Sequence, residues 1–245
     1  MILIDVGNTR IHFAYARGDT ITRRAYLDTQ DADTSSIRRV FDRFPKGKVL
    51  ICSVVPNVTR LFPRKKNNTL VVGKDVAVPI RCRYNQKQVG QDRLLLAFGA
   101  GQCYRDARII IDFGTAITFD FLSSKGEYLG GFIFPGIEIS TKALARCALL
   151  PHIRLNAKNM KRKYSIARTT EESISRGVCE GVIAMINSWI ESYAARLIGQ
   201  TRIRKGQVIL TGGCAGMIRK RFTFPYRYDP DLIFRGMIRL VSPVR

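Results

Sequence analysis

The sequence predicts an α/β protein built from two similar halves, each a mixed sheet flanked by helices. An internal repeat is the first reason: MILIDVGNTR at residues 1–10 returns as RIIIDFGTAIT at residues 108–118. Each copy has a short, β-branched apolar run followed by Asp-x-Gly, which is typical of a buried strand that ends in a turn. The second reason is that runs with strand character alternate with stretches of helical spacing. Together they indicate a duplicated fold.

The expected elements follow in chain order. Strands are expected near residues 2–5, 11–17 and 48–53, with a polar helix over 34–44 and a helix from Gln91 to Cys103. The second run has strands near 108–112, 116–122 and 128–134, then helical apolar spacing over 136–149 and 170–197. Thr170, with Glu172 and Ser173 behind it, is an acceptable helix start. No linker separates the halves, so the repeat alone places the boundary, giving domains of residues 1–106 and 107–245.

The repeated turn has the residue types that hold phosphate. Glycine lets the backbone approach a ligand closely, since it has no Cβ. Asp5 and Asp112 end their strands; a bare polyphosphate would repel them, so they are expected to hold a cation such as Mg²⁺. One such turn is more often an ordinary strand end, but two at matching places favour a phosphoryl-transfer cleft. Backbone and hydroxyl donors for phosphate oxygens would come from Asn8, Thr9, Thr115 and Thr118.

Other chemistries find little support in the sequence. Neither G-x-x-x-x-G-K-[ST] nor G-x-G-x-x-G occurs, which argues against a P-loop NTPase and a Rossmann dinucleotide site. The six cysteines form no C-x-x-C pair, so reduced thiols are favoured over zinc. The two histidines lie in no recognisable nucleophilic triad. A third glycine turn, VILTGGCAG at residues 208–216, leaves room for a flat group such as adenine, although strand-Gly-Gly is common.

Six motifs in order carry a family resemblance. They are DVGNTR from Asp5, GQDR from Gly90, IDFGTAITFD from Ile111, GGFIFPGI from Gly130, TEESISRG from Thr170 and LTGG from Leu210. The series, which extends to DPDLIFRGM at residues 229–237, resembles the type III pantothenate kinases of the acetate and sugar kinase/Hsc70/actin superfamily. The resemblance implies duplicated ribonuclease-H-like halves of the actin-like ATPase type. It also implies ATP-dependent phosphorylation of pantothenate to 4'-phosphopantothenate, the first step of coenzyme A biosynthesis.

The resemblance also implies a role for each matching residue. Asp92 would be the general base that accepts the proton of the pantothenate hydroxyl, and Asp112 would hold a monovalent cation, K⁺ or NH₄⁺. Thr170 would complete the pantothenate pocket, either within the chain or from the partner subunit of the family's homodimer. ATP with Mg²⁺ would contact Asp5, Val6, Gly7, Asn8, Thr9, Arg10, Thr115, Gly212 and Gly213. Pantothenate would contact Tyr84, Gly90, Gln91, Asp92, Arg93 and Thr170.

These roles are chemically reasonable, because phosphoryl transfer depends on positioning and charge neutralisation. The planar fork of Arg93 suits the pantothenate carboxylate. Outside this motif context, an Asp92-Arg93 pair at a helix start would more often be a plain surface ion pair.

The net charge of +22 is the feature that a kinase does not require. It could attract nucleic acid or another polyanion, steer ATP, or reflect general composition. No nucleic-acid-binding motif accompanies it. No apolar run reaches the roughly twenty residues of a membrane span, and no signal-peptide pattern opens the chain, so a cytoplasmic enzyme is expected. Two alternatives stay open: a kinase-like regulatory or nucleic-acid-associated accessory protein without kinase activity, and a phosphotransferase for sugar or acetate.

Overall fold

The computed structural model describes residues 1–63, 68–83, 85–153, 155, 166–198 and 202–242. The chain forms two compact units, and each is described by itself. Unit 1 comprises residues 1–106, 125–130 and 231–245, and unit 2 comprises residues 107–124 and 131–230. The sequence-based boundary after Asp106 is one of the junctions between the units, and the segment from Asp231 belongs to unit 1. No helix in the described ranges is long and apolar enough to cross a membrane.

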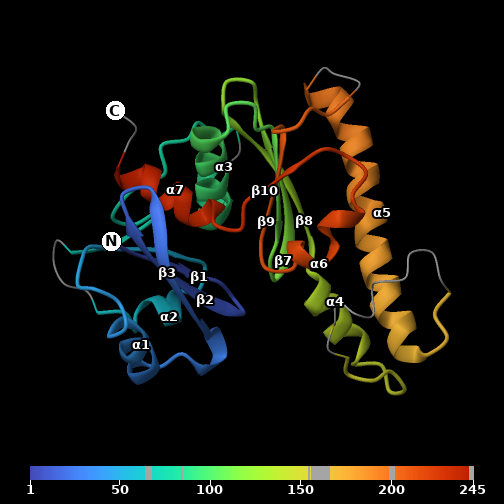
Figure 1. The fold of residues 1–245 in the computed structure, drawn as a ribbon, viewed down its shortest axis with the longest axis horizontal. Helices are drawn as coiled ribbons and strands as arrows, with labels where there is room; N and C mark the ends of the chain where they lie inside the picture. The colour runs from blue at the N-terminus through green and yellow to red at the C-terminus, as the bar shows by residue number, and fades with distance from the viewer. Residues whose placement is uncertain (64–67, 84, 154, 156–165, 199–201, 243–245) are drawn as a thin grey trace. The chain divides into compact units, whose positions relative to one another are not determined.

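Unit 1 is built on a five-stranded sheet with the order β3-β2-β1-β4-β5. β1 pairs antiparallel with β2 and parallel with β4, and β3 and β5 are the edge strands (Figure 1). Its elements are β1 (Ile2–Val6), β2 (Arg10–Arg17), β3 (Thr20–Asp28), η1 (Thr29–Asp31), α1 (Thr34–Phe41), β4 (Val49–Ser53), α2 (Pro56–Thr59), β5 (Thr69–Val71), η2 (Gln86–Gln88), α3 (Gln91–Cys103) and α7 (Leu232–Val241).

The two faces of this sheet are covered by different helices. Ile4, Ile11 and Phe13 pack with Ile37 and Val40 of α1 in one apolar cluster. The alternate residues of the strands face the other way, because side chains alternate along a strand; there α7 packs against β1 and α3 against β4. Burial of both faces fixes β1 as a central strand.

Two glycines let α3 and α7 cross closely. A Cβ on Gly99 would lie 2.8 Å from the Cα of Gly236, and a Cβ on Gly236 would lie 2.7 Å from the carbonyl oxygen of Leu95. Larger residues would push the helices apart, since packed interiors have no room for an extra carbon. This crossing helps to fix α3, whose first turn carries Asp92.

Unit 2 repeats the same sheet order, β10-β9-β6-β7-β8, with β6 at the centre. β6 pairs antiparallel with β7 and parallel with β9, as β1 does with β2 and β4. β8 (Tyr128–Pro135) begins in unit 1 and continues into unit 2. The other elements are β6 (Ile109–Phe113), β7 (Ala116–Leu122), α4 (Ile137–Leu144), α5 (Thr170–Ile198), β9 (Val208–Thr211), α6 (Ala215–Ile218), η4 (Arg219–Arg221) and β10 (Arg227–Tyr228).

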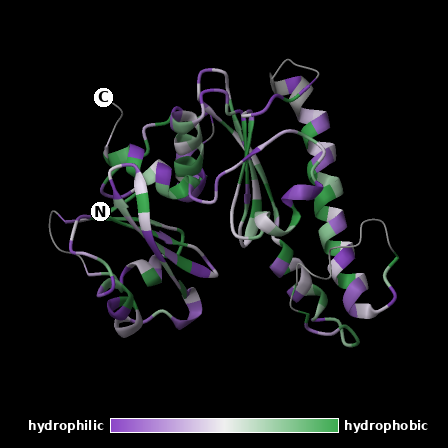
Figure 2. Cartoon of the chain, viewed as in Figure 1, coloured by the Kyte–Doolittle hydropathy of each residue, from purple (hydrophilic) through white to green (hydrophobic). Residues whose placement is uncertain are grey.

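Aromatic side chains attach α5 to its sheet. Trp189 of α5 contacts Phe119 of β7 and Phe132 of β8, with ring centroids 5.6 Å and 5.1 Å away. Edge-to-face pairs of this kind are favourable beyond the area that they bury. Figure 2 shows α5 with hydrophobic and hydrophilic residues interleaved along its length, which is expected of a helix with one covered side.

The expected mixed sheets flanked by helices are confirmed. α4 ends at Leu144 rather than near Leu149, and β3 and α7 are additions that the sequence reading did not contain.

Candidate active site

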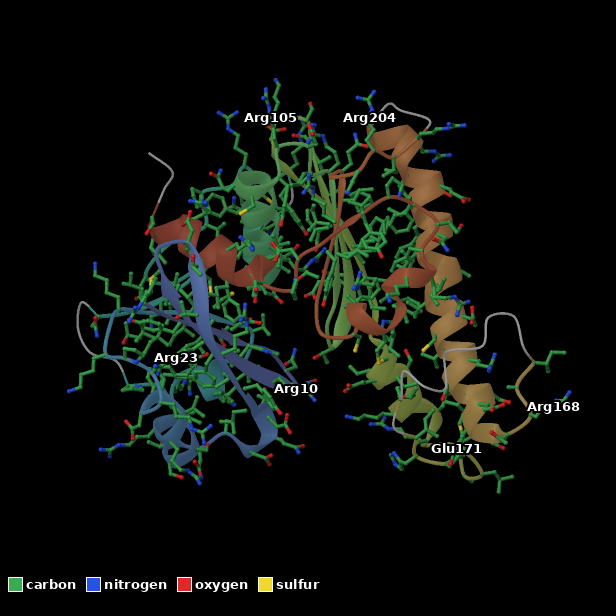
Figure 3. All side chains as sticks on the ribbon, viewed as in Figure 1. Arg10, Arg23, Arg105, Arg168, Glu171 and Arg204 are labelled. Carbon is green, nitrogen blue, oxygen red and sulfur yellow. The ribbon has the colours of Figure 1, made fainter. Side chains whose placement is uncertain are left out.

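The turn of the first repeat, expected to hold phosphate and called the first phosphate loop, connects β1 to β2 in unit 1. It consists of Gly7, Asn8 and Thr9, and the amide of Gly7 donates to the carbonyl of Arg10 at 3.0 Å, which closes a tight turn. A Cβ on Gly7 would lie 3.1 Å from that same carbonyl oxygen, so glycine suits this position. Arg10 begins β2, and Figure 3 labels its side chain there. Val6 is fully buried beneath the loop.

Asp5 is the only residue of β1 that is not fully buried, and it lies near a second carboxylate. Burial, and after it the negative charge of Asp92, raises the pKa of Asp5 to about 7. The same two carboxylates, after burial, raise the pKa of the Cys52 thiol, which is the parallel-strand partner of Asp5. The structure therefore brings Asp5 and Asp92 together, although 87 positions separate them.

Asp92 lies in the first turn of α3 and bends back over the start of the helix. Its Oδ1 accepts the backbone N–H of Arg93 at 2.8 Å. A Cβ on Gly90, the residue before the helix, would collide with the same oxygen. Glycine at this position therefore leaves the space that the carboxylate occupies. The N-terminal end of a helix also stabilises a negative charge.

The neighbours of Asp92 have structural contacts of their own. The Gln91 side chain packs against Gly73, which has a φ of +80° and no room for a Cβ beside that side chain. Arg93 is only 8% exposed, and its guanidinium carbon lies 5.9 Å from the ring centroid of the fully buried Tyr128. Burial strengthens any ion pair that Arg93 forms with an anion. Tyr84 lies outside the described residues.

The second phosphate loop lies in unit 2 and is built from glycines. Asp112 occupies the fourth place of β6, as Asp5 does in β1. Gly212 has a φ of +88°, and a Cβ there would collide with Oδ1 of Asp112 and the backbone of Phe113. The amide of Gly136 donates to the carbonyl of Thr115 at 3.0 Å. Three of the sequence motifs thus meet at one end of this sheet.

Two sequence-based interpretations concern threonines of unit 2, and one of them needs correction. The Thr118 hydroxyl donates to the buried carboxylate of Asp120 at 2.9 Å, so its single proton is not directed toward phosphate. The helix start expected at Thr170 is confirmed, because α5 begins there and the hydroxyl of the preceding Thr169 accepts the amide of Glu172 at 3.1 Å. Thr170 is exposed. Figure 3 labels its neighbours Arg168 and Glu171 at this end of α5.

Metal ligands are sparse in the site. No group of three or more His, Cys, Asp or Glu side chains gathers within the described ranges. Mg²⁺ commonly uses only one or two carboxylates and takes its other ligands from substrate phosphates and water, so Asp5 would suffice as its carboxylate ligand. None of the six cysteines, all of which lie in the described ranges, forms a disulfide.

The sequence reading missed the residue that supports the first loop. Thr29, just after β3, is 8% exposed; its hydroxyl donates to the carbonyl of Gly7 at 2.7 Å and its amide to the carbonyl of Thr9 at 2.9 Å. No sequence signal marked this threonine, because β3 lacks a regular apolar pattern.

The comparison with known families decides the assignment. The sequence profile described as Type III pantothenate kinase matches residues 1–192. This chain belongs to the type III pantothenate kinase family. Its relatives include proteins named Type III pantothenate kinase from Persephonella marina, 35% identical over 99% of this chain and 98% of the relative, and from Geobacter sulfurreducens, 34% identical over 89% of each.

Solved structures support the fold of this pantothenate kinase family member. A Campylobacter jejuni protein described as a Baf family transcriptional activator covers 99% of this chain and 98% of its own, with a TM-score of 0.65 at 21% identity. An archaeal actin homologue, Ta0583, covers 98% of both chains with a TM-score of 0.51 at 11% identity. The expected duplicated fold, ribonuclease-H-like in each half and actin-like as a whole, is therefore confirmed.

Proposed function

We propose that this protein transfers a phosphoryl group from ATP to the primary hydroxyl of pantothenate, the first step of coenzyme A biosynthesis, with Asp92 as general base. Membership of the family supports the reaction. The observation that carries the assignment of Asp92 is its place: at the start of α3, near Asp5 at the end of β1 and the first phosphate loop. An acid–base group beside a phosphate loop is what this transfer needs.

The reaction requires little covalent chemistry from the protein. Asp92 accepts the hydroxyl proton as the oxygen attacks the γ-phosphorus, and the loop of Gly7, Asn8 and Thr9 holds the phosphates by backbone donors. Arg93 binds the pantothenate carboxylate, supported by its position directly after Asp92 and by its low exposure. Gly90, Gln91 and Tyr84 complete the acceptor site in this proposal.

Two cations take part in the proposal. Mg²⁺ neutralises charge on the transferring phosphates, and Asp5 would hold it or its water. Asp112 would hold the monovalent cation, K⁺ or NH₄⁺. In support, the carboxylate oxygens of Asp112 lie against glycine backbone, with a Cβ on Gly114 placed 3.6 Å and 3.7 Å from them. Backbone carbonyls are the groups that most often replace the hydration shell of K⁺. Thr115, Gly212 and Gly213 would contact ATP.

A homodimer in the cytoplasm, where ATP is available, completes the proposal. Ile133, Phe134 and Ile139 of β8 and α4 are 64%, 36% and 42% exposed. Large exposed apolar side chains in one region favour an interface. Thr170 is exposed as well, so a partner subunit's pantothenate could reach it. Light scattering of the purified protein at micromolar concentration would test the dimer, and a monomer would contradict it.

The deciding experiment is phosphorylation of pantothenate by the purified protein, followed by mass spectrometry. Wild type with ATP and Mg²⁺ is expected to form phosphopantothenate faster in potassium than in sodium buffer. Equal rates in the two buffers would remove the cation role of Asp112. Failure to form product in any buffer would contradict the proposed reaction. It would favour an accessory role, and the lysine and arginine clusters would then be tested for polyanion binding. These clusters lie at residues 60–66, 158–168, 202–205 and 219–221, and the first two extend outside the described residues.

A further inference from the structure

The residue that follows β3, Thr29, fixes the first phosphate loop by hydrogen bonds. Thr29 makes two hydrogen bonds to it, one from its hydroxyl to the carbonyl of Gly7 at 2.7 Å and one from its amide to the carbonyl of Thr9 at 2.9 Å. Thr29 is 8% exposed, so water does not compete freely for these acceptors. The loop is therefore attached at both of its ends to Thr29, directly after β3.

The hydrogen bond from the Thr29 hydroxyl to the Gly7 carbonyl sets the orientation of a neighbouring backbone N–H that can bind phosphate. In a planar trans peptide the C=O of one residue and the N–H of the next point in opposite directions. When the Thr29 hydroxyl draws the carbonyl of Gly7 toward the sheet edge, the N–H of Asn8 is turned to the opposite side. A loop that binds phosphate through backbone amides depends on that orientation being set before the ligand arrives.

The second loop shows that the hydroxyl is an addition and not part of the shared fold. The residue after the third strand of unit 2 is Gly136, and its amide also donates to the last loop residue, Thr115, at 3.0 Å. A Cβ on Gly136 would collide with the carbonyl oxygen of Thr115 and lie 2.6 Å from that of Gly114. The backbone bond is thus common to both halves, whereas a side-chain bond exists only where threonine replaces glycine.

We propose that Thr29 is a positioning residue for phosphoryl-donor binding, and that its hydroxyl orients the Asn8 amide through the Gly7 carbonyl. The proposal rests on the proposed function for the identity of the donor as ATP with Mg²⁺. Thr29 itself touches neither substrate; it acts through the loop. Removal of the Thr29 hydroxyl is therefore expected to weaken binding of the phosphoryl donor more than binding of the phosphoryl acceptor.

The test is a titration of the full-length protein with a non-hydrolysable ATP analogue and Mg²⁺, which needs no acceptor. Thr29→Val keeps the volume and the backbone bond and removes the hydroxyl. It is expected to weaken analogue binding by about tenfold, the size of one lost hydrogen bond to a buried acceptor. Thr29→Ser, which keeps the hydroxyl, is expected to bind within about twofold of wild type. The matched control is Thr22→Val on β3, the strand that precedes Thr29; the exposed hydroxyl of Thr22 donates to the carbonyl of Tyr15 at 3.2 Å.

Steady-state kinetics give a second reading. Thr29→Val is expected to raise KM for ATP while KM for pantothenate stays within about twofold, because only the donor loop is altered. Analogue binding equal to that of wild type would overturn the proposal. Equal losses of analogue binding in Thr29→Val and Thr29→Ser would also overturn it. The hydroxyl, which only Thr29→Ser keeps, would then not matter, as expected of a purely structural role. Thr29→Ala serves as the second deletion if the valine variant does not fold.

The outcome separates this proposal from the proposed function. If wild type binds the analogue but never phosphorylates pantothenate, the reaction is wrong and the titration still decides the role of Thr29. If wild type does not bind the analogue with Mg²⁺, the positioning role is overturned as well.

Discussion

The two phosphate loops occupy the same place in two copies of one sheet, yet their aspartates have different surroundings. Asp5 and Asp112 are each the fourth residue of a central strand, and each strand is otherwise fully buried. Asp5 lies near a second carboxylate, Asp92, whereas Asp112 lies against the backbone of Gly114 and Gly212. A carboxylate pair suits proton transfer beside a divalent cation, and a glycine-lined carboxylate suits a cation held partly by backbone. The two halves therefore share one scaffold, while the surroundings of their aspartates differ.

The largest expected effect separates the two aspartates. Asp92→Asn is expected to lower kcat by about 10²- to 10⁴-fold with little change in KM for ATP, because a positioned base is lost while the fold stays. Asp112→Asn is expected to lower the rate less and to abolish the difference between potassium and sodium buffers. Asp106→Asn, at an exposed turn, is the matched control. Full activity of Asp92→Asn would remove this residue from the mechanism.

Substitution of its glycines tests how the backbone of the second loop depends on them. Gly212→Ala places a Cβ on the Asp112 carboxylate at a positive φ and is expected to destabilise the protein by about 1–3 kcal/mol. Gly213→Ala meets no atom within 4 Å and is expected to change stability by less than about 0.5 kcal/mol. Urea unfolding of both variants measures the difference. Equal stabilities would show that Gly212 is not required by the backbone.

The carboxylate pair predicts a pH dependence for the first loop. The pKa of Asp5 rises from 3.8 to about 7 on folding, so the folded protein binds the extra proton between these values. Stability from this group is therefore greatest at low pH and falls as the pH rises toward 7. In metal-free buffer, Asp5→Asn is expected to melt a few degrees above wild type at pH 8 and to lose that advantage near pH 4.

A second aspartate gives the control of opposite sign for that experiment. Ser36 and Ser35 hydrogen bonds lower the pKa of Asp33, the N-cap of α1, to about 2. Asp33 therefore stabilises the folded state at pH values above 3.8, and this contribution is lost as the pH falls toward 2. Asp33→Ala is expected to melt below wild type at pH 8. If the melting temperature of Asp5→Asn does not exceed that of wild type at pH 8, the unfavourable pairing of the Asp5 and Asp92 carboxylates is contradicted.

The smallest expected effect concerns Arg10, which has no counterpart in the second loop. Its guanidinium carbon lies 5.7 Å from the ring centroid of Tyr26, and its Nε lies 3.4 Å from Oδ1 of Asp28. Exposed contacts of this kind contribute about 0.5–1 kcal/mol. Tyr26→Leu is expected to raise KM for ATP by about two- to fivefold through a less ordered Arg10. Tyr26→Phe, which keeps the ring, should match wild type, and an effect of equal size in both would point away from the ring.

Much of the fold could be predicted because local patterns encode it. The apolar runs that precede Asp5 and Asp112 predicted two buried strands, and the glycines that follow predicted turns. β3 was missed because its residues are mostly exposed, as suits an edge strand, and so carry no apolar alternation. α7 was missed although it packs on α3, because its partner lies more than a hundred residues earlier. The roles assigned to individual site residues remain predictions that the proposed variants test.

The sequence by itself determined the duplicated halves, their loops and the family, since strands, turns and motif order are written in neighbouring residues. Only the tertiary structure decided which groups meet. Asp5 reaches Asp92 because α3 packs against the strand beside β1. Thr29 reaches Gly7 because β3 folds back along β2. These contacts depend on how the chain packs over long separations, and no local pattern records such distances.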